Sequence, residues 1–168
     1  PAGVQVSTPA ASIETTVGNL LVGTVDAGGT AGDVVLTADT VAGQSVVDAT
    51  SLVTADDLSI NVNGNIGDIT TFPASAAWTP AGTPINIEAA ELLSVTTTEA
   101  ASEIYLSEAT SVAISAVGAL VPGGANAADA IIVAGADITA GPGAAVITLA
   151  GGDDLSLALE NVERDQID

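Results

Sequence analysis

The chain has 168 residues and a net charge of -20, because 21 acidic side chains stand against a single Arg and no Lys. Lys and Arg neutralise the phosphates of nucleic acids, so the composition excludes nucleic acid as a partner. No apolar run approaches the length of about 18 residues that spans a bilayer, and no membrane insertion is expected. Without His or Cys, the usual zinc, haem, iron–sulfur and thiol chemistry is excluded. A hydrophobic content of 48% is too high for a disordered chain.

Short apolar runs recur along the chain, each bounded by Gly, Asp, Asn or Thr. Such runs, many of them rich in β-branched residues, predict short β-strands. Two of them, at 58–63 and 155–160, alternate strictly in large apolar residues, which predicts one buried and one solvated face. In chain order the runs lie at 20–22, 34–36, 58–60, 85–87, 93–95, 104–106, 112–114, 131–133, 146–148 and 155–157.

Helix-forming residues gather in only two short stretches, 88–93 and 125–129. Each would make one or two turns at most, which is too short to be stable without tertiary packing. The better candidate, 88–93, leads directly into the β-branched run 95–98. The strand pattern dominates, so we expect an all-β fold with a single elongated domain over residues 1–168.

Aromatic residues are rare, with only Phe72, Trp78 and Tyr105 in the chain. β-sandwich cores usually contain large aromatic anchors, whereas a narrow parallel β-helix is filled by Val, Ile, Leu and Ala from coils stacked about 4.8 Å apart. The Asn- and Gly-rich segment 61–65 suits a corner between such coils. We therefore expect a parallel β-helix, with a β-sandwich surface-layer or pilin-like subunit as the alternative.

Residues 17–68 and 85–115 share a repetitive texture. Gly18 to Val22 fits the pattern G-D/N-L-x-V/I, and Gly32 to Ala38 fits G-x-V-x-L-x-A. Gly64 to Gly67 fits G-x-I-G, and Glu103 to Leu106 fits D/E-I-Y-L. Over roughly half of the chain, this texture resembles the repeat region of filamentous-haemagglutinin-type exoproteins and related large secreted bacterial adhesins. The resemblance implies a right-handed parallel β-helix (solenoid), secretion across the outer membrane, and adhesion or matrix building.

The segment 67–84 departs from this texture. It contains Phe72, Trp78 and three Pro residues. Because Pro occurs mainly in loops and edge strands, we expect a loop excursion here. An exposed Trp often anchors a binding partner, so Phe72 and Trp78 are candidate interaction residues. The alternative is that both fold back onto the solenoid wall as a local minicore. Tyr105, between Ile104 and Leu106, is expected to face outward and pack on a neighbour in the adjacent coil.

Paired carboxylates precede two of the apolar runs, at Asp56 and Asp57 and at Asp153 and Asp154. Ca²⁺ prefers carboxylate oxygens, so these four residues are candidate calcium ligands. Carboxylates at turns also serve as caps and in Asx-turns, which leaves a purely structural role open. No other cofactor is expected.

The composition does not suit catalysis. A β-helical lyase needs Lys, Arg or Ca²⁺ to neutralise its substrate, and the chain offers only Arg164. We expect a non-enzymatic structural or adhesive module of a secreted, extracellular protein of the bacterial cell surface or matrix, self-associating or joined to neighbouring repeats and assembling into filaments. The alternative is a binding module that recognises a glycan or host protein through the 67–84 loop or a calcium-bridged acidic face. Because bases are nearly absent, self-association should rise with ionic strength or divalent ions.

Overall fold

The computed structural model describes residues 4–7, 10–15, 19–27, 31–38, 46–48, 52–71, 81–99, 102–119, 130–142, 145–149 and 155–159. Within these residues every regular element is a β-strand, and each of the ten predicted apolar runs lies in one, so the all-β expectation is confirmed. The strands are β1 (Val4–Ser7), β2 (Ala10–Thr15), β3 (Leu20–Asp26), β4 (Asp33–Ala38), β5 (Val46–Asp48), β6 (Val53–Val62), β7 (Asp68–Thr71), β8 (Ala81–Thr83), β9 (Ile85–Thr97), β10 (Ile104–Glu108), β11 (Val112–Ile114), β12 (Ala116–Ala119), β13 (Ala130–Ala134), β14 (Ile138–Ala140), β15 (Val146–Leu149) and β16 (Leu155–Leu159).

One of the two helix candidates is wrong, because 88–93 lies inside the 13-residue strand β9. Ala, Glu and Leu are good helix formers, but tertiary context readily overrides propensity, and here β9 pairs with strands on both sides. The other candidate, 125–129, lies outside the described residues.

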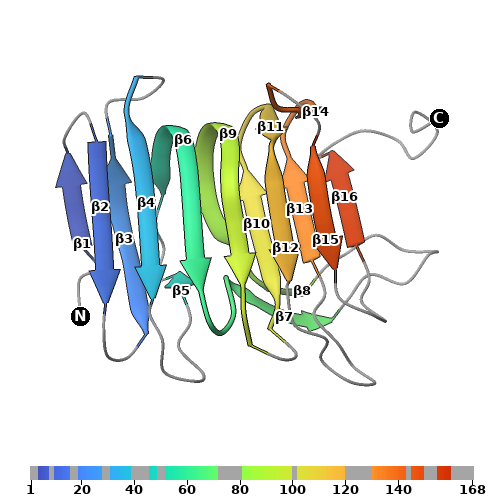
Figure 1. Cartoon of the computed structure of the whole chain (residues 1–168), viewed down its shortest axis with the longest axis horizontal. Coiled ribbons are helices and arrows are strands. Elements are labelled where there is room, and N and C mark those ends of the chain that lie inside the picture. The colour runs from blue at the N-terminus through green and yellow to red at the C-terminus, as the bar shows by residue number, and fades with distance from the viewer. Residues whose placement is uncertain are drawn as a thin grey trace.

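Fourteen strands form one sheet, and every strand pairing recorded within it is parallel. The pairings follow two rows. The first row has the order β1-β3-β6-β9-β10-β13-β16. The second row runs from β2 through β4, β6 and β9 to β11 and β12, which pair onward with β14 and β15. Figure 1 shows the strands following one another along the longest axis, with β1 at one end and β16 at the other.

The register places apolar residues of successive strands side by side. In the second row Leu36 pairs with Ile60 and Ile60 with Val95, and all three are fully buried. In the first row Leu106 pairs with both Ile85 and Ile132, which are buried to the same degree. Each such side chain stabilises the fold by about 1.5–3 kcal/mol relative to exposure. The alternation predicted for 58–63 is confirmed, because residues 58, 60 and 62 are buried and 59, 61 and 63 are half-buried.

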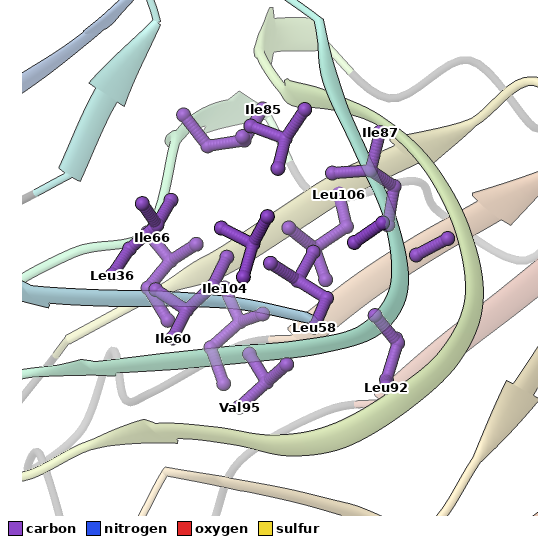
Figure 2. Close-up of a cluster of buried hydrophobic side chains, with 14 of the residues drawn as sticks. Leu36, Leu58, Ile60, Ile66, Ile85, Ile87, Leu92, Val95, Ile104 and Leu106 are labelled. Atoms are coloured by element: carbon purple, nitrogen blue, oxygen red, sulfur yellow. The ribbon is translucent and has the colours of Figure 1, made fainter. Parts of the chain in front are cut away.

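Both rows enclose a single hydrophobic core. Figure 2 shows β6 and β9 bending round this core, with Ile85 and Ile87 on one side and Leu92 and Val95 on the other. The two halves of β9 therefore pack against the same interior, and the strand bends between residues 85–87, which pair with β10, and residues 91–92, which pair with β11. The most deeply buried carboxylate of the described chain lies at this bend.

Candidate functional site

Glu108, at the end of β10, has only 1% of its surface exposed and lies in an inward register position between Ile87 and Ala134. Its Oε2 accepts a hydrogen bond from the backbone N–H of Ala89 at 2.7 Å. Its Oε1 accepts hydrogen bonds from the N–H and the hydroxyl of Thr110, at 2.8 and 3.0 Å. On this side of β9, residues 85–87 pair with β10 and 91–92 with β11. The carboxylate thus provides the acceptor that strand pairing does not supply at the bend.

The environment of this carboxyl group favours its neutral form. Burial raises the pKa of Glu108 above its ordinary value, and the nearby charge of Glu88 raises it further. The hydrogen bonds from Ala89 and Thr110 oppose this by stabilising the charged form, but the net direction of the pKa is upward. Glu108 therefore connects β10 to the bend of β9 at an electrostatic cost. Nothing in the sequence indicates this role, since Glu108 follows Ser107 at the end of an apolar run, where a solvent-exposed acid would be equally expected.

Three carboxylates lie on consecutive strands of the second row. Asp57 of β6 pairs with Glu91 of β9, and Asp33 of β4 occupies the position before Val34, which pairs with Leu58. Burial and the charges of Glu91, Asp33 and Asp56, in that order, raise the pKa of Asp57. The hydroxyl of Ser115 donates a hydrogen bond to Glu91 Oε1. The parallel register therefore gathers acids that are far apart in the sequence.

The four calcium candidates are only partly placed by the structure. Asp57 lies in the row just described, while Asp56 donates its backbone N–H to the carbonyl of Gly32 at 2.8 Å. Asp153 and Asp154 lie outside the described residues. Within the described ranges, no group of three or more acidic side chains is arranged to hold a metal ion. Calcium binding by these residues stays a prediction.

The segment 61–65 uses three Asn side chains to reach the neighbouring strand and turn. Asn61 Oδ1 accepts hydrogen bonds from the hydroxyls of Thr96 at 2.8 Å and Ser94 at 3.3 Å. Asn63 Oδ1 accepts one from the hydroxyl of Thr98, and Asn65 Oδ1 accepts one from the N–H of Glu103 at 3.0 Å. These contacts join residues more than 30 positions apart, so the Asn-rich run connects neighbouring layers as well as turning the chain.

Residues 68–83 contain a separate two-stranded antiparallel sheet of β7 and β8. Ile69 of β7 packs with Tyr105 and Ile131 in a second hydrophobic cluster, outside the main core. The N–H of Ile69 also donates a hydrogen bond to Glu103 Oε2 at 3.0 Å. Tyr105 pairs with Ile131 of the next strand, as expected, but it is only 7% exposed because Ile69 packs against it too. Burial raises the pKa of the Tyr105 hydroxyl.

The candidate interaction residues Phe72 and Trp78 lie in the connection between β7 and β8, outside the described residues. The choice between a binding anchor and a local minicore therefore stays open. Of the strands on either side of this connection, β7 contacts β10 through the cluster of Ile69 and Tyr105.

Comparison with known proteins identifies no relative of this chain. No family model, curated protein or solved structure matches it. Among the described residues, no helix is long and apolar enough to cross a membrane. The resemblance to filamentous-haemagglutinin-type repeats therefore stays a prediction from the sequence.

Proposed function

We propose that the chain is a segment of a right-handed parallel β-helix. The parallel pairing supports this, because Val34 pairs with Leu58, 24 residues later, and Leu106 pairs with Ile132, 26 residues later. Between such partners the chain passes through the other row, and side chains of both rows share one core. Parallel crossover connections are overwhelmingly right-handed, which gives the hand of the helix. The β-sandwich alternative is built from antiparallel strands and is disfavoured by this pairing.

The function that this architecture supports best is a non-enzymatic structural or adhesive module of a secreted bacterial cell-surface or extracellular matrix protein. The repeated register carries this proposal. Each layer contacts mainly its neighbours, so the fold extends along one axis, and an elongated fold of this kind suits a spacer. The seven strands of the first row, spaced about 4.8 Å apart, extend only about 30 Å. A long fibre then requires neighbouring repeats or further copies of this chain. The textural resemblance to adhesin repeats is the observation that supports a location outside the cell.

Removal of one coil tests this proposal. Deleting residues 34–57 joins Asp33 to Leu58, which occupies the register position of Val34. In a repeating spacer the shortened chain folds cooperatively, with a somewhat lower urea midpoint than the full chain. Deleting 34–58 instead joins Asp33 to Ser59 and shifts every following side chain of that strand to the other face. We expect this control to be much less stable; equal behaviour of the two deletions contradicts the proposal.

The hairpin of β7 and β8 favours a second candidate, a binding module. It is a separate two-stranded sheet that packs on β10, and the residues between its strands include Phe72 and Trp78. Exposed aromatic side chains often anchor a binding partner such as a glycan or a host protein. Glycan-array binding that is lost in Trp78→Ala, with an unchanged urea midpoint, supports this candidate. A lower midpoint in Trp78→Ala without any bound glycan supports the minicore and removes the candidate.

A further inference from the structure

The strands β1 and β16 are the two ends of the first row. Among the described strands, β1 pairs with β3 and β16 with β13, and each leaves its other edge open. Because every pairing between them along the row is parallel, β1 and β16 run in the same direction. Figure 1 places them at opposite ends of the longest axis. A second copy displaced along this axis therefore brings its β1 beside β16 in a parallel orientation.

The end strands carry few charged residues, as do β11, β12 and β13 farther in. No charged residue occurs in β1, β14, β15 or β16, and β2 contains only Glu14. In contrast, β6 and β9 each carry two acids. Natural proteins commonly protect open strand edges with charged side chains. In a chain of net charge -20, β1 and β16 themselves lack that protection.

The last layer of the described core is also incompletely covered. Leu157, Ile147 and Ile138 are only half-buried, although they pair with buried residues one layer inward, namely Ile132, Val117 and Val112. Val146 beside them is 55% exposed. At the other end, Ile13 is half-buried while its partner Leu36 is fully buried. Each end thus presents apolar residues in the same inward positions.

We propose that the end formed by β14, β15 and β16 docks the β1 and β2 end of a second copy of this chain, with β1 pairing in parallel with β16. The inference rests on the proposed β-helix and identifies its partner surface. In β1, Val4 and Val6 pair with Val22 and Val25 of β3, whose side chains are buried. In β16, Leu155, Leu157 and Leu159 pair with Ala130, Ile132 and Ala134 of β13, which are buried. The contact is heterologous and open, so its repetition produces a filament.

The chain's own last residues are a less suitable cover for this end. Residues 160–168 include Glu160, Glu163, Arg164, Asp165 and Asp168. A segment with five charges among nine residues brings little apolar surface to an apolar layer, whereas β1 brings alternating Val residues. The remaining acids of each copy still repel one another at long range, so docking strengthens with ionic strength.

Cysteine cross-linking tests the proposal, because the natural chain has no Cys. Gln5→Cys places a thiol in β1, and Ser156→Cys or Ala158→Cys places one in β16. Adjacent strands bring backbone positions to a separation that a disulfide accepts. In about 0.5 M salt, which screens the acids, we expect a covalent dimer in an oxidised mixture of Gln5→Cys with a β16 variant. We expect none from either variant alone, and none from Gln5→Cys mixed with Thr37→Cys, in the interior strand β4.

Three outcomes overturn the proposal. They are the absence of a dimer in both mixtures, equal dimer from Gln5→Cys alone, and a dimer that forms only after residues 160–168 are removed. The second outcome indicates a head-to-head contact, and the third assigns the open end to the chain's own tail. The coil-deletion experiment does not depend on docking, so the proposed β-helix can stand when the docking fails.

Discussion

The Oε2 atom of Glu108 lies 2.7 Å from the backbone nitrogen of Ala89, which is 19 residues earlier in the chain, and accepts its hydrogen bond. The contact joins the end of β10 to the bend of β9, where one strand turns from the first row into the second. An open backbone N–H in the interior costs free energy, and so does a buried carboxylate. The hydrogen bond satisfies the N–H of Ala89 and offsets part of the cost of burying the carboxylate of Glu108.

Removing this acceptor should destabilise the fold. In Glu108→Ala the N–H groups of Ala89 and Thr110 lose their partner, and we expect the free energy of unfolding to fall by about 1–3 kcal/mol. Glu108→Gln keeps one carbonyl oxygen and removes the charge, so its loss should be smaller. Urea denaturation measures both. Glu88→Gln, which removes only the neighbouring charge, is the control and should not lower stability.

The stability of the fold should decrease between mildly acidic and neutral pH. The pKa values of Glu108 and Asp57 are both raised in the folded chain, from ordinary values of 4.5 and 3.8. The folded state therefore holds these protons more tightly than the unfolded state does. Their stabilising contribution is complete below the ordinary values and is lost as the pH rises through the folded values.

Urea midpoints measured from pH 4 to about pH 7 test this dependence. The groups that oppose ionisation are Glu88 for Glu108, and Glu91, Asp33 and Asp56 for Asp57. The decrease should be smaller in a chain carrying both Glu108→Gln and Asp57→Asn. A midpoint that rises steadily over this range, or a double variant with the full dependence, would show that these two groups do not control it.

Thr97 and Thr96 should respond oppositely to the same substitution. The hydroxyl of Thr97 is fully buried and has no hydrogen-bond partner in the described part of the chain. Thr97→Val keeps the shape and removes this unsatisfied group, so stability should rise by about 1 kcal/mol. Thr96→Val removes the hydrogen bond to Asn61 and should lower stability by about 0.5–1.5 kcal/mol. Thermal unfolding of the two variants provides the comparison, and equal signs would refute the assignment.

Gly67 should not tolerate a side chain. Its φ of 73° is in the left-handed region, and a Cβ there would lie 2.7 Å from the carbonyl oxygen of Tyr105 and 2.9 Å from that of Thr83. Both contacts are with backbone, which cannot move aside cheaply. Gly67→Ala should lower the free energy of unfolding by about 1–3 kcal/mol. Thr83→Ala, at an exposed position of β8, is the control; a neutral Gly67→Ala would contradict the packing of the hairpin against β10.

The sequence determined the strands, because the alternation of residues 58–63 is a local pattern that needs no knowledge of the partner strand. It also separated residues 67–84 from the repetitive texture, since Pro and aromatic residues interrupt the apolar runs there. The weak helix candidate 88–93 lies in a strand instead, because pairing on both sides of β9 outweighs local propensity. The absence of His and Cys argued against the usual zinc, haem, iron–sulfur and thiol chemistry.

Only the tertiary structure decided which residues meet. The alignment of Asp33, Asp57 and Glu91 depends on register, and register depends on the lengths of the turns between strands. Glu108 is buried where β10 meets the bend of β9. Tyr105 is buried because Ile69 of β7 packs against it. An alternating pattern gives the face of each residue within its strand, but the neighbours across the sheet come from segments more than 20 residues away. Because these neighbours are distant in the sequence, the sequence alone does not distinguish the buried Glu108 from acids that are exposed in the fold.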